Sequence, residues 1–310
     1  MAGRILSRIL QIIPTLILIT VAAFVLVRLL PGDPTATFLG ERARESDIVR
    51  INAQLGLDRP IVVQFWLFLV RLAHGDLGTS IVLKAPVASL IADRLPVTLL
   101  LTLYAAVISI VLSVPLAFLA ALRRDRPADL LVRGAFQVGL STPVFYLGLV
   151  LLTVFAAGLR WFPVGGYGNS WGERLYSLFL PALTLALSLA AVLMRNLRAA
   201  VIEVLDAEYV DFARAKGLRP RLVLFRHVLR NALISTVTLF GLSIGALISG
   251  AVVTETVFAI PGVGRLMIES IYGRDYPVVQ GLTLVLAVLV SVVFLLTDIA
   301  QAALDPRVGR

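Results

Sequence analysis

Few residues in this chain have the chemistry to act as catalysts or metal ligands. Its 310 residues include two histidines, His74 and His227, and no cysteine. Thiolate catalysis and zinc–thiolate sites are therefore excluded. The topology derived below places the two histidines on opposite sides of a membrane, where they cannot share a metal ion. The sequence also lacks the G-x-x-x-x-G-K-[ST] loop that cradles ATP phosphates. We therefore predict that the chain is not an enzyme and binds no metal or cofactor of its own.

The long apolar stretches contain few ionisable residues. Arg28, Glu255 and Asp298 fall toward their ends, and none falls at a midpoint. Transporters driven by protons or sodium usually carry such groups deep in the membrane, so any transport by this chain needs a separate motor. Glu255 is a candidate for the wall of a translocation path. The alternative is an interfacial carboxylate, hydrogen-bonded beside the turn that follows it.

Small residues supply further candidates for such a path. Gly241, Gly245 and Ser249 fall four positions apart, a spacing that lets two membrane helices approach closely. Their neighbour is either another span of the same chain or a span of a second chain.

The composition places the chain in a membrane. Hydrophobic residues make up 59% of the sequence and charged residues only 15%, whereas a soluble domain of this length needs far more charge to cover its surface. The formal net charge is +9, but the basic residues fall in loops between apolar runs. This excess is predicted to orient the protein in membrane lipid and not to bind nucleic acid.

Six apolar runs are close to or longer than the roughly 20 residues that cross a bilayer core. Basic residues collect in alternate loops, for example Arg123, Arg124 and Arg126, and the positive-inside rule places these loops in the cytoplasm. We predict an all-α integral membrane protein with six transmembrane helices and both termini inside. The predicted spans are residues 9–30, 95–122, 134–159, 178–197, 232–258 and 278–304.

These spans divide the chain into three regions. They are an N-terminal span (1–30), an external insertion (31–94), and a five-span core (95–310) with a cytoplasmic loop at 199–231. The insertion is predicted to hold two helices. Ser46 caps the first, which ends at Gly56; Pro60 opens the second, which is too short to cross the membrane and is expected to lie on the outer side.

The cytoplasmic loop is patterned as two short amphipathic helices around a glycine. Asp206 is predicted to cap the first helix, with Glu208 near its positive end. Leu205, Tyr209 and Phe212 fall on one face at helical spacing. Gly217 is predicted to end the helix in the left-handed conformation.

The second loop helix is predicted to begin at Pro220, which suits a first helical position. Its apolar face, at α-helical spacing, comprises Leu222, Phe225, Val228 and Leu229. Such a helix–turn–helix on a membrane face is predicted to meet another protein.

At these residues the sequence resembles a known family. Residues 208–218 (EYVDFARAKGL), followed by His227 and by LRNAL at 229–233, resemble the EAA signature of bacterial ABC-importer permeases. This motif is most similar to that of the dipeptide/oligopeptide/nickel subfamily, and LGLDRP at 55–60 resembles its B-type subunit. Asp211 and Phe212 stand where Arg-Thr is common there, and Ser235 stands where a proline usually follows.

The resemblance implies a type I ABC-importer permease in the bacterial cytoplasmic (inner) membrane. Its loop would be a coupling helix that docks on an ATP-binding subunit. The residues implied in this coupling are Leu205, Asp206, Glu208, Tyr209, Phe212, Ala213, Arg214, Lys216, Gly217 and His227.

The resemblance also implies partners and a substrate. The partners are a second related permease, two ATP-binding subunits that hold ATP and Mg²⁺, and an extracytoplasmic substrate-binding protein, which the insertion is expected to help seat. Short peptides are the expected substrate. Nickel or glutathione import and an ATP-independent channel or scaffold remain alternatives.

Overall fold

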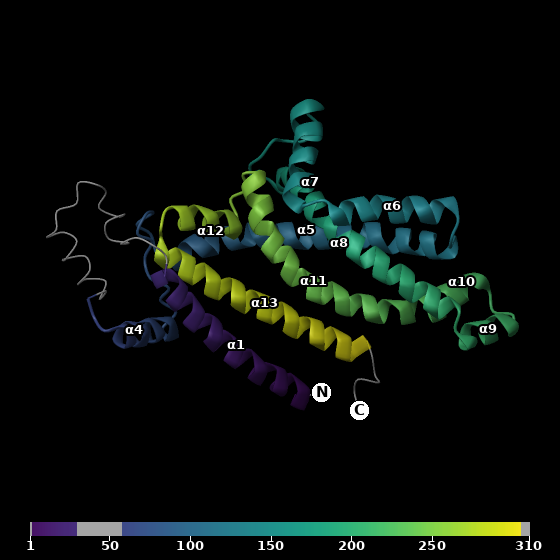
Figure 1. The fold of residues 1–310 in the computed structure, drawn as a ribbon, viewed down its shortest axis with the longest axis horizontal. Coiled ribbons are helices and arrows are strands. Elements are labelled where there is room, and N and C mark those ends of the chain that lie inside the picture. The colour runs from purple at the N-terminus through teal and green to yellow at the C-terminus, as the bar shows by residue number, and fades with distance from the viewer. Residues whose placement is uncertain (1, 30–57, 305–310) are drawn as a thin grey trace.

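The computed structural model describes residues 2–29 and 58–304, which form a bundle of helices (Figure 1). Within these ranges the only pairing of extended segments is an isolated bridge between Thr79 and Pro86. Four helices are long and apolar enough to cross a membrane. They are α5 (Val87–Leu122), α8 (Trp171–Leu205), α11 (Arg230–Val257) and α13 (Tyr276–Leu304).

These four helices confirm the second, fourth, fifth and sixth predicted spans, but two are longer than expected. α5 begins at Val87, behind Pro86, and continues through Pro96. The predicted boundary at residue 95 therefore falls inside a helix. α8 begins at Trp171 because Ser170 and Glu173 form a capping box, a signal that the sequence contains.

The predicted third span, 134–159, is not one continuous helix. In its place α6 (Pro127–Ser141) is followed, at a bend of 107°, by α7 (Val144–Leu151) and the π-helix η1 (Leu152–Gly158). Thr142 has φ −91° and ψ 126°, and Pro143 has φ −56° and ψ 136°. The residue before a proline avoids the helical region, and proline has no N–H to donate. α6 lies along the bundle, whereas α7 and η1 run across its direction, with α7 packed against α8 and α11 (Figure 1).

Two further helices lie at the edge of the bundle. α1 (Ala2–Leu29) lies beside α13 and occupies the place of the predicted first span. α4 (Ile61–Ala73) confirms the predicted helix after Pro60. Its Phe65 and Phe68 rings lie 5.0 and 5.7 Å from the Phe24 ring of α1. The helix predicted at 46–56 falls outside the described residues.

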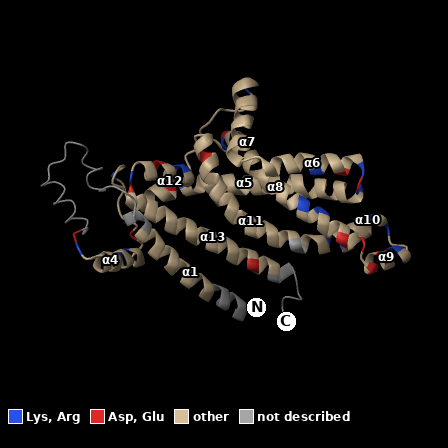
Figure 2. Cartoon of the chain, in the orientation of Figure 1, with Lys and Arg blue, Asp and Glu red and all other residues tan. Residues whose placement is uncertain are grey.

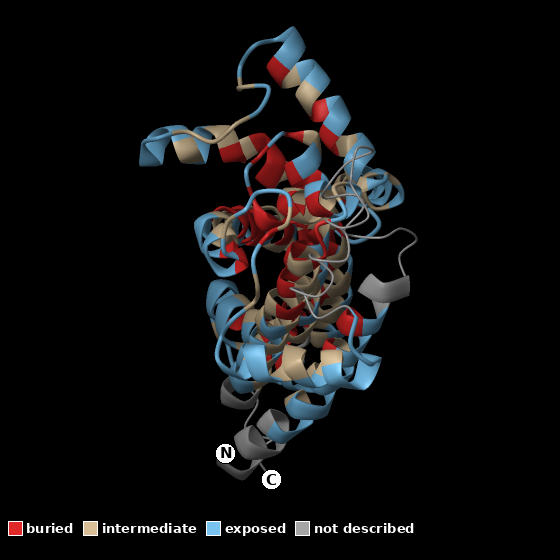
Figure 3. Ribbon diagram, turned by 90° about the vertical axis from the view of Figure 1, so that its left-hand side faces the viewer, coloured by how far each residue is buried: buried red, intermediate tan, exposed pale blue. Residues whose placement is uncertain are grey.

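Buried residues gather toward the middle of the bundle in the view along it (Figure 3), and their apolar side chains form three clusters. The middle cluster joins α5, α8 and α11. It includes Ala105, Ala182 and Ala186, all fully buried, whose small side chains let the helices approach closely. One end cluster joins α5 and α13 to the short helix α12 (Val263–Tyr272). The other joins α5 and α8 to the loop that leads into α11.

Most charged residues gather toward the two ends of the bundle, with long uncharged stretches between them (Figure 2). The terminal ends of α1 and α13 lie toward the same end as the loop helices α9 (Glu208–Ala215) and α10 (Pro220–Leu222) (Figure 1). This arrangement agrees with the predicted orientation, in which both termini and the loop are cytoplasmic. α4 and α12 lie at the opposite, external end.

Candidate partner-binding surface at the cytoplasmic end

The loop after α8 starts later than the sequence indicated. α8 continues through Leu205, and Asp206 is its C-cap, whose backbone N–H donates to the carbonyl oxygen of Ile202. α9 begins at Glu208 behind Ala207, and no side chain caps it. The predicted N-cap role of Asp206 is therefore wrong, because the last turn of α8 already includes that residue.

α9 ends at Gly217, as predicted. Gly217 has a φ of +75°, and its N–H donates to Arg214 O at 2.9 Å. The N–H of Leu218 donates to Ala213 O at 3.4 Å. This is the Schellman arrangement, which requires a left-handed residue, and glycine adopts that conformation without a Cβ clash.

Pro220 begins the second helix, as predicted, but no break separates this helix from the membrane span. α10 runs directly into the π-helix η2 (Val223–Leu229) and then into α11. Because π-helical hydrogen bonds join residues five apart, Val223 and Val228 share a face, and both are buried. The predicted apolar face assumed α-helical spacing. It is wrong for Leu222 and Phe225, which are exposed.

Small apolar side chains attach α9 to the membrane helices. Val210 and Ala213 are 0% and 5% exposed. They join one buried cluster with Val201 of α8 and with Val223 and Val228 of η2. Close-packed interiors transmit displacement, so a movement of α9 moves the ends of α8 and η2 with it.

The other side of the loop presents aromatic side chains to solvent. Phe212 and Phe225 are 62% and 63% exposed, and Tyr209 is 45% exposed. The Lys216 ammonium lies 4.5 Å from the centroid of the Phe212 ring. Exposed aromatic residues with basic neighbours are typical of protein–protein contacts. We call Tyr209, Phe212, Leu222 and Phe225 the coupling surface.

Polar contacts fix the position of the coupling surface. The Asn231 amide of α11 donates to the Tyr209 hydroxyl at 3.1 Å and to the His227 carbonyl at 2.7 Å. His227 therefore contributes its backbone oxygen to this connection. Asp211, one of the two unusual residues, accepts a hydrogen bond from Arg214 at 3.2 Å.

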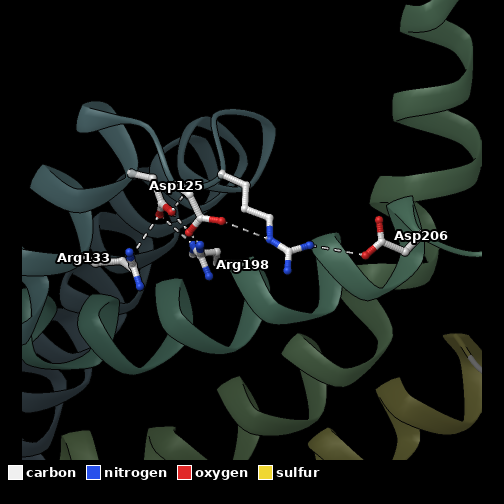
Figure 4. A network of polar contacts seen from close by, with 6 residues as sticks. Asp125, Arg133, Arg198 and Asp206 are labelled. Carbon is white, nitrogen blue, oxygen red and sulfur yellow. Dashed lines mark hydrogen bonds and ion pairs between the residues drawn. The ribbon is translucent and has the colours of Figure 1, made fainter.

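A buried carboxylate joins α6 to α8 at the same end of the bundle (Figure 4). The Asp129 side chain is fully buried and accepts two hydrogen bonds from Arg198, at 2.8 Å from Nε and 2.6 Å from Nη2. Arg133 lies 3.3 Å from the same carboxylate, and the backbone N–H of Asp125 donates to it at 3.0 Å. Bidentate arginine–carboxylate pairs fix both orientation and distance, so this pair locks the two helices together.

A more exposed bridge continues this network to the loop. The Arg124 guanidinium lies 3.6 Å from Asp125 and 3.5 Å from Asp206, the residue that ends α8 (Figure 4). Sequence reasoning missed the Asp129–Arg198 pair, whose members are 69 positions apart. The available signal was an acidic residue in the first turn of a helix that follows an arginine-rich loop.

At the external end, Glu255 is fully buried. Its carboxylate accepts hydrogen bonds from the backbone N–H groups of Gly264 (2.8 Å) and Arg265 (3.0 Å) and from the Thr98 hydroxyl. Gly264 and Arg265 lie in the first turn of α12, where a carboxylate is favoured. Glu255 thus caps α12 beside the turn that follows it. Its role in a translocation path stays a prediction.

The small residues of α11 face two directions. A Cβ atom at Gly241 would lie 1.9 Å from the Thr297 side chain of α13, and one at Gly245 would lie 3.4 Å from Phe294. These glycines therefore pack against another helix of the same chain. Ser249 is exposed and donates to Gly245 O at 3.3 Å, so it remains a candidate for the path.

No arrangement suited to catalysis or metal binding appears in the described part of the chain. Gly241, Ser243 and Gly245 have the Gly-x-Ser-x-Gly spacing of many hydrolases, in which the serine occupies a strand-to-helix turn. Ser243 instead lies inside α11, and its hydroxyl donates to Leu239 O at 2.7 Å. Among residues 2–29 and 58–304, no three His, Cys, Asp or Glu side chains gather as a metal site.

The helical bundle, with its long apolar helices and its firmly held loop, defines a class of protein, a multi-pass membrane permease. The family model for the binding-protein-dependent transport system inner membrane component matches residues 113–310, and the model for the N-terminal part of such components matches residues 1–102. The chain belongs to this family of inner membrane transport components.

Relatives resemble it along almost its whole length. A putative peptide transport system permease protein of Brucella suis is 42% identical over 311 residues, 99% of each chain. The oligopeptide transport system permease protein AppB of Bacillus subtilis is 40% identical over 314 residues, again 99% of each. The glutathione transport system permease protein GsiC of Salmonella typhimurium is 38% identical over 308 residues, with the same coverage.

A solved structure shares the fold. The inward-facing MetNI methionine ABC transporter aligns with a TM-score of 0.61 and 17% identity, covering 70% of this chain and 97% of the matched one. This likeness confirms the predicted type I ABC-importer permease fold.

Proposed function

We propose that this chain is the permease subunit of an ATP-driven importer of short peptides. It would form the translocation path with a second, related permease, and two ATP-binding subunits would bind its cytoplasmic end. A substrate-binding protein would deliver the peptide from outside. The family match and the names of the peptide-transport relatives support this proposal.

The observation that carries the proposal is the coupling surface. Phe212 and Phe225 are exposed on a loop whose opposite side is buried among the membrane helices. An ATP-binding subunit that grips these rings would move α9 and, through the buried cluster, the ends of α8 and η2. The Asp129–Arg198 pair would carry the same displacement to α6. ATP and Mg²⁺ would bind in the partner subunits, so this chain is expected to convert nucleotide-driven closure into a rigid-body movement of helices.

Glutathione import is the second candidate, and the 38% identical GsiC permeases favour it. Glutathione is itself a short peptide, so both candidates require a path that accepts amide and carboxylate groups. The substrate-binding protein is expected to make most of the selection between them.

The test uses the left-handed turn at Gly217. A Gly217→Pro variant cannot adopt the observed φ of +75°, because proline is restricted to a φ near −65°. We expect an ATP-binding protein to co-purify with the tagged wild-type chain from solubilised membranes. In the variant, that protein should be lost, or its ATP hydrolysis should no longer drive import.

Gly172→Ala is the matched control, because Gly172 has open space around it and no positive φ. This variant should retain the ATP-binding protein. If the wild-type chain purifies alone, or with a partner that does not hydrolyse ATP, the importer proposal fails and a channel or scaffold becomes the better account.

A further inference from the structure

The bend between α6 and α7 places irregular backbone at membrane depth. α6 starts beside the arginines of the cytoplasmic loop and has 15 residues, which is about 22 Å of helix. The break at Thr142 and Pro143 therefore lies within the roughly 30 Å hydrocarbon core. Pro143 is exposed, and α7 begins without a side-chain cap. Such backbone does not occur facing lipid; it is covered by protein or it lines water.

The outward side of α6 becomes polar as it approaches this break. Gln137 and Ser141 lie one turn apart and are both exposed, with 3.4 Å between the amide nitrogen and the hydroxyl. Leu131 and Val138, at 74% and 68% exposure, point in a different direction around the helix. One helix thus presents a polar strip beside an apolar strip, the pattern expected where a helix separates water from lipid.

A hydroxyl of α8 at the same level lacks a partner. α6 and α8 run in opposite directions, with Asp129 bonded to Arg198. Residue 139 of α6 lies ten positions after Asp129, and Ser188 of α8 lies ten positions before Arg198. Ser188 is therefore level with residue 139, which lies between Gln137 and Ser141. The Ser188 hydroxyl is buried and has no hydrogen-bond partner among the described residues. Buried hydroxyls are nearly always paired with protein or ordered water, so this level of the bundle is suited to hydration.

We propose that Gln137, Ser141 and the non-helical turn at Thr142 and Pro143 line the water-filled path through which the solute moves. This inference rests on the proposed importer function and names the solute class that the strip would recognise. A glutamine amide both donates and accepts hydrogen bonds, as a peptide bond does, so the strip suits short peptides. An apolar helix of a second permease would bury these polar groups with no hydrogen-bond partner beyond their contact with each other, which is unfavourable.

The absence of cysteine from the chain makes a direct test possible. Ser141→Cys and Gln137→Cys are introduced singly into the tagged chain of the complete importer, in membranes. The membranes are treated with a charged, membrane-impermeant methanethiosulfonate reagent, and labelling of the tagged chain is followed over time. Val138→Cys is the control, because it lies at the same depth on the adjacent apolar strip. Import is measured in the same membranes.

We expect Ser141→Cys and Gln137→Cys to be labelled at least about tenfold faster than Val138→Cys, because the thiolate is the reactive form and a thiol facing acyl chains stays protonated. Equal rates at the polar and apolar positions, whether fast or slow, would overturn the inference and leave the importer function intact if import persists. If the unsubstituted importer does not use ATP for import, the proposed function fails. The labelling rates do not require ATP-driven import, so the three cysteine variants can still be compared in that case.

Discussion

The two ends of the bundle each contain a buried carboxylate, but the two carboxylates accept hydrogen bonds from different kinds of donor. At the external end, Glu255 accepts from backbone N–H groups of the first turn of α12. At the cytoplasmic end, Asp129 accepts from the side chain of Arg198 on another helix. Glu255 also accepts from the Thr98 hydroxyl of α5, so it joins α11 to α12 and α5 through neutral donors, whereas Asp129 joins α6 to α8 through a charged pair. If ATP-binding subunits act on the cytoplasmic end as proposed, the helices must be joined firmly there, and this is where the interhelical charged pair lies.

The largest effect is expected at Asp129. In the Asp129→Ala variant, the Arg198 guanidinium, whose side chain is only 16% exposed, would lose its buried partner. Breaking a buried pair in this way costs about 3–5 kcal/mol of unfolding free energy. The measurement is chemical denaturation of the purified chain in detergent.

A double variant tests whether the loss of stability comes from an unpaired buried charge or from loss of the Asp129–Arg198 pair itself. Asp129→Leu combined with Arg198→Met removes both charges and keeps apolar volume, so it should recover most of the loss. If the double variant is as unstable as Asp129→Ala, the pair is not what joins α6 to α8.

A smaller effect is expected at Glu255. Glu255→Ala would leave the backbone N–H groups of Gly264 and Arg265 without their acceptor, at a cost of about 1–3 kcal/mol. Glu255→Gln keeps one acceptor oxygen and should lose less. Limited proteolysis should show faster cleavage near α12 than elsewhere in the chain, and chemical denaturation should give the loss of unfolding free energy.

The control for Glu255 is Glu269→Ala. The Glu269 side chain is 47% exposed and pairs with Arg265 at 2.7 Å, and surface pairs of this kind contribute about 0–1 kcal/mol. Should Glu269→Ala destabilise the chain as much as Glu255→Ala, the external end does not depend on the buried cap.

The smallest effect on stability is expected at the coupling surface. Phe212→Ala and Phe225→Ala remove exposed rings, so the unfolding free energy should stay within about 0.5 kcal/mol of wild type. Retention of the ATP-binding partner during purification should nevertheless fall. Tyr272→Ala, which removes an 85% exposed ring at the external end, should leave that retention unchanged. If Tyr272→Ala lowers the retention of the partner as much as Phe212→Ala and Phe225→Ala do, the partner does not bind specifically at the cytoplasmic end.

Much of the loop could be predicted because its signals are local. Gly217 ends α9 and Pro220 begins the next helix, since each residue type restricts its own backbone. The capping box of Ser170 and Glu173 was equally local and could have been recognised. Most span positions also followed from runs of apolar residues, which need no knowledge of neighbouring helices.

The remaining features depend on contacts between distant residues or on a change of helical period. Asp129 and Arg198 are 69 positions apart, and Thr98 and Glu255 are 157 apart, so no local pattern pairs them. The exposure of Phe225 depends on η2, because a face read at α-helical spacing is wrong within a π-helix. Pro143 is a local signal for a kink in its span, but nothing local gives the angle of 107°.

The π-helix η2 also determines how the loop is rotated around the axis of α11. It connects Pro220 to the membrane span without a flexible joint, so the direction in which Phe225 points depends on the number of residues between them. Removing one residue from Val223–Leu229 would turn everything before it around the helix axis by the rotation of one residue. Substitutions within η2 should therefore be tolerated far better than insertions or deletions, and the length of this segment should limit which ATP-binding subunits the permease can accept.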